Sequence, residues 1–177
     1  PSTALVQILN ELKKIKFDNG TKNFQPTNLE ITKINIDNFA DNVIPGLANA
    51  KFNIRFNNKN TSSSIKKRID KIIKKISNKN KSKYKINYSV SGEAFLTKPN
   101  NTTFMIRDII QKITKIKPLL STTGGTSDAR FIRKIAPCLE FGLVGKTMHK
   151  VDEAVLLSDL KKLTLIYSNI LQNYFNK

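Results

Sequence analysis

The residues best suited to chemistry lie in the second half of the chain, in a glycine-rich stretch. Gly124 and Gly125 allow backbone N–H groups to approach an anion closely. Thr126 and Ser127 follow them directly and add two hydroxyl donors. The same stretch also fits a plain strand-to-helix turn capped by a hydroxyl or by Asp128. The spacing alone therefore leaves both an anion-binding loop and a structural turn open.

The only histidine, His149, is the second chemical candidate, because imidazole is a common zinc ligand. A zinc site needs three or four donors, so one histidine cannot build it. Taken alone, the pattern favours a structural histidine. The only cysteine, Cys138, cannot form an internal disulfide and does not by itself suggest a cysteine metal cluster.

The first 97 residues predict a two-layer α+β sandwich with an antiparallel sheet and two helices. Apolar residues at three- and four-residue spacing indicate helices, and alternation of apolar and polar residues indicates strands. Hydroxyl residues at 61–64 can cap the second helix. In chain order the prediction is a helix at 2–14, strands at 29–36 and 48–57, a helix with an isoleucine stripe at 65–76, and a strand at 84–90.

The pattern changes near residues 97–101, where we expect a second structural unit to begin. Helices now alternate with short apolar stretches, which predicts a piece of an α/β sheet. The predicted elements are helices at 104–115, 130–135 and 159–174 and strands at 118–121 and 138–142.

The formal net charge is +18, from 31 Lys and Arg against 13 Asp and Glu. Twenty Asn and twenty-two Ile accompany only five Arg, which is typical of an AT-rich coding sequence rather than of phosphate recognition. We therefore expect no specific nucleic-acid partner. The chain shows no secretory signal and no apolar run of membrane-spanning length, so a cytoplasmic protein without a membrane partner is expected.

Four motifs occur in one order along the chain. They are Asn-Val-Ile-Pro-Gly at 42–46, Phe-Asn-Ile-Arg-Phe at 52–56, Gly-Gly-Thr-Ser-Asp-Ala-Arg-Phe at 124–131 and His-Lys-Val-Asp-Glu at 149–153. In this combination the chain resembles the succinyl-diaminopimelate desuccinylase family, which belongs to a clan of zinc-dependent deacylases. The resemblance covers nearly the whole chain in a single register.

The resemblance implies a catalytic α/β domain interrupted by a lid. Residues 1–97 would be the lid, or dimerisation domain, and residues 98–177 the C-terminal part of the zinc-peptidase-like catalytic domain. The implied enzyme is a metal-dependent amidohydrolase. It hydrolyses N-succinyl-LL-2,6-diaminopimelate, a small-molecule substrate, to succinate and LL-2,6-diaminopimelate in lysine and diaminopimelate biosynthesis. The implied assembly is a homodimer through the lid.

The resemblance also implies roles for particular residues. His149 matches a terminal ligand of one of two zinc ions, for which cobalt is an alternative metal. Arg55 matches a residue that receives a substrate carboxylate, and Asn42 matches a lid asparagine that approaches the active site in the dimer. The loop from Gly124 through Gly125 and Thr126 to Ser127 matches a substrate-binding segment.

The chain departs from the family in three respects. It lacks the N-terminal half, which supplies the other zinc ligands and the general base, so we expect no catalytic residue here and no activity from the chain alone. An ungapped alignment puts Thr3 in place of a lid histidine, and Gly145 replaces an asparagine. A fragment, a separately encoded N-terminal half or a decaying gene would each explain the first departure. The alternative function is a non-catalytic dimerisation module with a basic partner-binding surface.

Overall fold

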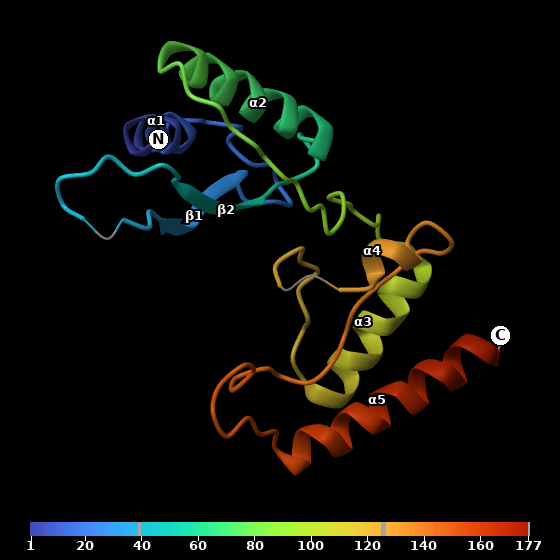
Figure 1. Ribbon diagram of the computed structural model, residues 1–177. Coiled ribbons are helices and arrows are strands. Elements are labelled where there is room, and N and C mark those ends of the chain that lie inside the picture. The colour runs from blue at the N-terminus through green and yellow to red at the C-terminus, as the bar shows by residue number, and fades with distance from the viewer. Residues whose placement is uncertain (39, 125–126, 177) are drawn as a thin grey trace. The chain divides into compact units, whose positions relative to one another are not determined.

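The structure is a computed structural model that describes residues 1–38, 40–124 and 127–176. The chain forms two compact units, Pro1–Phe95 (unit 1) and Leu96–Lys177 (unit 2). Figure 1 labels the elements of both.

Unit 1 consists of two helices and one antiparallel strand pair. The helices are α1 (Ser2–Lys13) and α2 (Ser62–Lys79), and the strands are β1 (Asn28–Asn35) and β2 (Asn49–Arg55). These bounds confirm the two helices and the first two strands that apolar spacing predicts. The Thr61 side chain accepts a hydrogen bond from the Ser64 backbone N–H, which confirms the expected cap of α2.

The core of unit 1 lies between the helices and the sheet. Leu12 of α1 and Ile69 of α2 are completely buried, and Leu29 of β1 is buried beside them. The predicted isoleucine stripe of α2 supplies most of the remaining buried side chains, namely Ile65, Ile73 and Ile76. The stripe therefore faces the core, and the lysines between its members face outward.

β1 contains a local irregularity that the sequence pattern reflects. Its apolar residues change phase between Ile31 and Ile34, and the register with β2 shifts between Ile31 and Lys33. Beyond this bulge Ile34 is 55% exposed. The core-facing part of β1 is therefore its first half, around Leu29.

The prediction of a β-strand at 84–90 is wrong, because these residues form no backbone ladder with another strand. The sheet of the described residues contains only β1 and β2. Residues 84–90 still lie against the core through Ile86 and Tyr88, which are partly buried. Alternation fixes which side chains face a core, but a strand also needs a neighbouring backbone to pair with, and none pairs here.

Unit 2 is helical in the part that the structure describes. α3 (Asn101–Thr114) packs against α5 (Leu157–Phe175), with Ile110 and Ile166 buried, and α4 (Ala129–Ile132) is a single short turn. The predicted strands at 118–121 and 138–142 do not form. Short apolar strands of an α/β sheet are stable only between other strands, and the described residues of unit 2 offer no such neighbours. The expected piece of an α/β sheet is therefore not observed.

Among the described residues, no helix is both long enough and apolar enough to cross a bilayer.

Candidate functional site

Unit 1 carries two of the predicted site residues, at opposite ends of β2. Asn42 lies in the exposed loop before β2, where the Asn38 side chain donates to the carbonyls of Ala40 (2.8 Å) and Val43 (2.7 Å). Arg55 is the last residue of β2. A strand rises about 3.3 Å per residue, so β2 spans roughly 20 Å between the end of that loop and Arg55. Within one copy of the chain they do not form a single site.

Arg55 is held on a defined backbone but has an exposed side chain. It pairs with Asn28 of β1, at the end of the hairpin where the core-facing half of β1 begins. It shares the outer face of β2 with Lys51 and Asn53, opposite Phe52 and Ile54. No acidic side chain within the described residues forms an ion pair with Arg55. Its guanidinium is therefore available to donate hydrogen bonds to a carboxylate from outside the unit.

Unit 2 carries the glycine-rich loop in front of α4. Gly124 has a φ of +134°, which strongly favours glycine, and a Cβ there would meet nothing within 4 Å. The Ser127 hydroxyl accepts a hydrogen bond from the Ala129 backbone N–H at 3.2 Å. This bond matches the structural-turn interpretation of the loop. Gly125 and Thr126, also predicted to bind substrate, lie outside the described residues.

His149 lies in an exposed turn of unit 2. The turn is held at its base by Thr147, whose hydroxyl donates to the Ala154 carbonyl (2.8 Å) and accepts from the Ala154 N–H (2.9 Å). His149 has a φ of +64° and Asp152 a φ of +60°, a left-handed conformation that is uncommon for residues with a Cβ. The imidazole is therefore presented from a well-defined and costly backbone conformation.

The residues that the structure describes do not complete a metal site. Among the described residues, no group of three or more His, Cys, Asp or Glu side chains gathers where an ion could bind. His149 is the one predicted ligand, whereas zinc takes three or four. His149 could therefore serve as one ligand of a metal ion, but the other ligands are not among the described residues.

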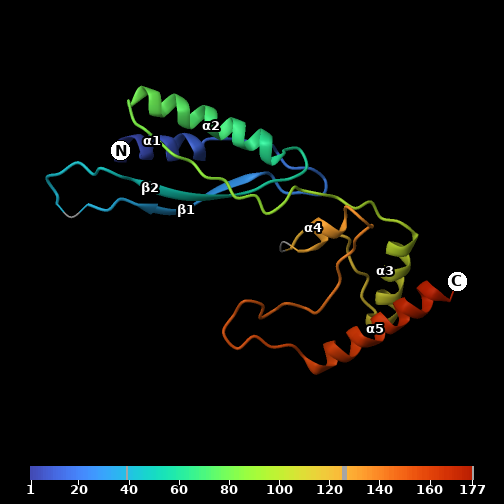
Figure 2. The same ribbon diagram turned by 45° about the vertical axis from the view of Figure 1, so that its right-hand side comes forward.

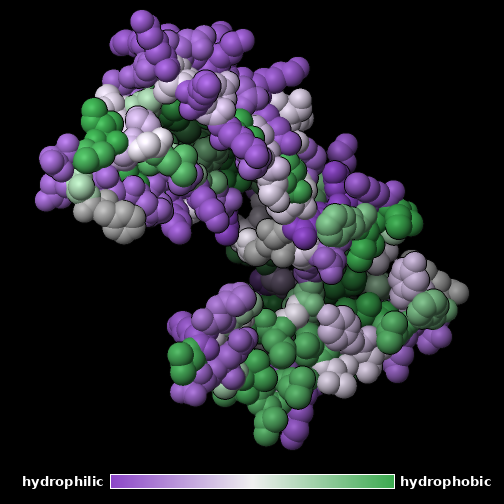
Figure 3. All heavy atoms as spheres, in the orientation of Figure 1, coloured by the Kyte–Doolittle hydropathy of each residue, from purple (hydrophilic) through white to green (hydrophobic). Residues whose placement is uncertain are grey.

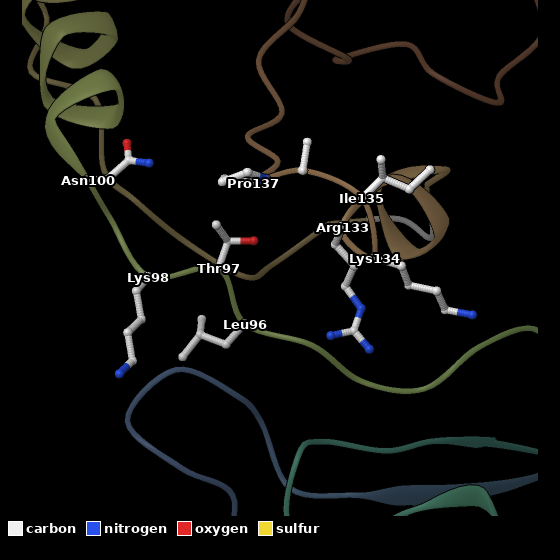
Figure 4. A pocket seen from close by; sticks show the side chains of 9 residues that line it. Leu96, Thr97, Lys98, Asn100, Arg133, Lys134, Ile135 and Pro137 are labelled. Atoms are coloured by element: carbon white, nitrogen blue, oxygen red, sulfur yellow. The ribbon is translucent and has the colours of Figure 1, made fainter.

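The described residues of unit 2 also line an open hollow of about 380 Å³, which no sequence motif indicates. Lys98, Arg133 and Lys134 are the charged residues in its lining. Figure 4 shows the cationic ends of these three side chains apart from one another. An anion site needs converging donors, so this hollow is not a candidate binding site.

A buried polar cluster in unit 1 was also not predicted. The Asp18 carboxylate accepts hydrogen bonds from the Gly20 N–H (2.6 Å) and from the side-chain amides of Asn57 (2.6 Å) and Asn60 (2.7 Å). Partial burial raises the pKa of Asp18, but hydrogen bonds from Thr27, Gly20 and Asn57 outweigh it and lower that pKa to about 2. The cluster joins the loop between α1 and β1 to the loop between β2 and α2 and is structural.

Comparison with known families matches the N-terminal part of the chain. Residues 1–81 match the family described as the peptidase dimerisation domain.

The similarity to individual proteins extends over 99% of the chain. The chain is 79% identical over 175 residues to the succinyl-diaminopimelate desuccinylase of Pelagibacter ubique. It is 45% identical over 175 residues to the protein of that name from Maricaulis maris and 42% identical over 176 residues to the one from Wolbachia pipientis. The chain spans 46%, 45% and 43% of the lengths of these three relatives, which is less than half of each.

Proposed function

We propose that this chain is part of a succinyl-diaminopimelate desuccinylase, a metal-dependent amidohydrolase. Its reaction is hydrolysis of N-succinyl-LL-2,6-diaminopimelate to succinate and LL-2,6-diaminopimelate. The observation that carries the proposal is the 79% identity, over 99% of the chain, to a protein of that name. Among the described residues no group of three or more His, Cys, Asp or Glu side chains gathers where an ion could bind, so a metal site in the proposed enzyme would need donors from further polypeptide.

The two units take different parts in the proposed enzyme. Unit 1, with the match over residues 1–81, is the lid through which two copies associate. Unit 2 is the C-terminal part of the catalytic domain. Its exposed apolar side chains, such as Ile135 and Val151 at 91% exposed each, support this assignment because such residues are normally covered in a complete domain.

The substrate is proposed to be held by residues of both units. Arg55 receives a substrate carboxylate through its two-pronged guanidinium. Gly124 and Ser127 offer backbone and hydroxyl groups in the loop before α4. Asn42 lies at the far end of β2 from Arg55, which supports a role in the active site of a second copy rather than in that of its own copy.

His149 is proposed as one metal ligand. When bound, the metal ions, two zinc ions or cobalt in their place, would supply Lewis-acid activation of water and of the amide carbonyl. The remaining ligands and the general base must come from polypeptide outside this chain. The contribution of the chain itself is to fix the imidazole in the Thr147–Ala154 turn.

The test is hydrolysis of the succinyl substrate by the chain alone and by the chain supplemented with the rest of a desuccinylase. The rest can be the part of the Pelagibacter ubique relative that lies outside its match with this chain. We expect turnover only from the combination, with metal content lost in His149→Ala. Turnover by the chain alone, or none by a folded combination, would contradict the proposal.

The role of Arg55 has a matched control on the same strand. Lys51 lies on the same outer face of β2 and carries the same charge. A charge-assisted hydrogen bond contributes about 1.5–3 kcal/mol, so Arg55→Ala should raise KM by roughly tenfold or more in the active combination. Lys51→Ala should leave KM unchanged. Equal effects of the two variants would mean that only the net charge of the strand matters.

The dimer is tested by sedimentation of the chain over a range of concentrations. Closed two-fold association is the commonest form of oligomer, and the dimerisation-domain match supports it here. A species of twice the chain mass is expected. Only monomer at high micromolar concentration would count against association through unit 1 alone.

A second candidate function is supported by the basic face of α2. Lys67, Lys71, Lys74 and Lys75 are exposed on this helix, whereas Lys66 and Arg68 lie over the rings of Tyr88 and Phe17. We expect only weak, salt-screened binding of nucleic acid here, because lysines on one helix face read no sequence. Tight, sequence-selective binding in a fluorescence titration would favour a non-catalytic binding module instead.

A further inference from the structure

Asn19 and Gly20 form the only Asn-Gly dipeptide in the sequence, and they lie in the loop between α1 and β1. Asparagine is chemically labile, most of all when a glycine follows it. Once the Gly20 backbone nitrogen loses its proton, it can attack Cγ of the Asn19 side chain and expel ammonia. The product is a five-membered cyclic imide, which one water molecule opens to aspartate or to isoaspartate. Glycine favours this ring closure because it has no side chain to obstruct it.

The fold requires a glycine at position 20. Gly20 has a φ of +78°, and a Cβ there would lie 2.7 Å from the Phe24 carbonyl oxygen and 3.0 Å from the Pro26 nitrogen. Gly20 is buried, whereas Asn19 beside it is exposed. The geometry of this loop therefore keeps a glycine after Asn19, and water can reach the Asn19 side chain.

The Asp18 carboxylate occupies the position that the reaction needs. The Gly20 N–H donates to Asp18 Oδ1, with 2.6 Å between the nitrogen and the oxygen. In the cyclic imide this nitrogen carries no hydrogen, and Cγ of Asn19 takes the place of the proton. Cγ cannot enter that place while the carboxylate oxygen lies against it. The hydrogen bond must therefore break before the ring can close.

Asp18 is also unsuited to act as the base for this reaction. Partial burial raises the pKa of Asp18, but its hydrogen bonds outweigh burial and lower that pKa to about 2. Near neutral pH the carboxylate is therefore charged and a poor proton acceptor. Its negative charge beside the Gly20 nitrogen raises the energy of an amide anion there. Both effects keep the proton on Gly20.

The contact between Asp18 and Gly20 depends on the fold of unit 1. Asp18 also accepts hydrogen bonds from the side-chain amides of Asn57 (2.6 Å) and Asn60 (2.7 Å), which lie 39 and 42 residues further along the chain. Figures 1 and 2 both show the loop between α1 and β1 beside the segment that leads from β2 into α2. The carboxylate is therefore positioned against Gly20 by contacts that exist only while unit 1 is folded.

We propose that Asn19 is a site of spontaneous deamidation that the Asp18 carboxylate protects in the folded protein, so that modification follows only when the loop between α1 and β1 opens. Both products add a carboxylate next to Asp18. The isoaspartate form also lengthens the backbone between Asp18 and Gly20 by one carbon, which moves the Gly20 N–H away from its acceptor. Opening of the loop would thus lead to a lasting loss of stability of unit 1. The inference does not depend on the proposed reaction.

Mass spectrometry of peptides from the 177-residue chain measures deamidation at Asn19 after incubation in mildly alkaline buffer, with and without unfolding concentrations of urea. We expect modification of the folded chain to be slower by about tenfold or more, because a charge-assisted hydrogen bond must break first. Asn19→Gln should remain unmodified on this time scale, because glutamine would have to close a larger ring. Its urea midpoint should stay constant through repeated unfolding and incubation, whereas that of the wild type should fall.

Two kinds of variant separate the role of Asp18 from that of overall stability. Asp18→Ala should raise the rate in the folded chain by about tenfold or more. Ile69→Ala lowers the stability of unit 1 in its core and leaves the hydrogen bonds of Asp18 in place, so it should raise the rate less. Where Asp18→Ala does not stay folded by circular dichroism, Asp18→Asn replaces it. That variant keeps an acceptor oxygen but loses the charge, and it too should exceed Ile69→Ala.

Two results would overturn the inference. Equal rates of deamidation at Asn19 with and without urea would mean that the fold gives no protection. A rise in Ile69→Ala as large as that in the Asp18 variant would mean that modification follows global unfolding rather than release of Asp18. Neither readout uses turnover, so failure of the proposed hydrolysis would leave this test intact.

Discussion

The two units differ in how many of their apolar side chains are buried. Unit 1 buries a continuous stripe from α2 against α1 and β1, with Leu12 and Ile69 fully inaccessible. Unit 2 buries few apolar side chains, among them Ile110 and Ile166, and many others are exposed. Figure 3 shows the difference as hydrophilic surface over α2 and broad hydrophobic surface over unit 2.

The difference shows that helix formation and core formation have separate requirements. α3 has a full capping box at Asn100 and Thr103, as α2 has at Thr61 and Ser64. Both helices are therefore locally well specified. Only α2 also finds enough partners within the chain to bury its apolar face. If unit 1 is the cooperative part of the molecule and the apolar surface of unit 2 is uncovered, substitutions in the two units should differ in their effects on stability.

The largest effect is expected from the core of unit 1. Ile69→Ala should lower the free energy of unfolding by about 2–5 kcal/mol, since it removes methylene groups from a completely buried site and leaves a cavity. Urea unfolding followed by circular dichroism measures it. Val6→Ala, at a position 59% exposed on α1, is the control and should change it by less than about 0.5 kcal/mol. Similar values for both would show that unit 1 has no specific core.

The Asp18 cluster should give the next largest effect. Asp18→Ala removes one of the two acceptors of each side-chain amide of Asn57 and Asn60, and burial of Asn57 makes this costly, on the order of 1–3 kcal/mol. The same urea titration measures it. Loss of less than half a kcal/mol would show that water replaces the carboxylate.

The same carboxylate predicts a pH dependence. The pKa of Asp18 falls from its ordinary value of 3.8 to about 2 on folding, so its stabilisation is present above pH 3.8 and is lost as the pH falls toward 2. Asp18→Asn should remove that part of the acid sensitivity. Unfolding midpoints measured across this range, for wild type and variant, should converge at the acid end, and parallel curves would contradict the assignment.

Substitution of the helix-capping residues in each unit allows a direct comparison of how the two units unfold. Thr61→Ala should cost about 1 kcal/mol in the urea transition of unit 1, because the Ser64 N–H loses its acceptor, and Thr61→Ser should restore it. Asn100→Ala removes the equivalent bond to Thr103 in unit 2. We expect that change to fray α3 locally, seen as faster amide exchange, without moving the main transition. A common shift of the main transition would mean that the units unfold together.

The smallest effect on stability is expected at the exposed apolar surface of unit 2. Ile135 is 91% exposed, so Ile135→Ser should change the free energy of unfolding by less than about 0.5 kcal/mol. It should reduce binding of a hydrophobic dye, because it breaks part of an uncovered apolar surface. A loss of stability comparable to that of Ile69→Ala would show that Ile135 is packed after all.

Short motifs predict which residues belong to the candidate site, whereas their positions depend on the fold. The structure places Arg55 on a strand and Asn42 in a loop, with roughly 20 Å of strand between the end of that loop and Arg55. No motif could reveal that distance, because it depends on where β2 begins and ends. The bonds between Asp18 and Asn57 were likewise hidden, since they join residues 39 apart in the chain.

Spacing of apolar residues by itself determined the four long helices and the hairpin. A helix closes its backbone hydrogen bonds internally, and a hairpin pairs two neighbouring segments, so both can be recognised locally. Only the tertiary structure decided whether strands form at residues 84–90, 118–121 and 138–142. Their patterns specify a face but not a partner, and a strand without a neighbouring backbone leaves its N–H and C=O groups unpaired. The tertiary structure of this chain leaves those segments without such a neighbour among the described residues, because a sheet forms only where enough strands are present together.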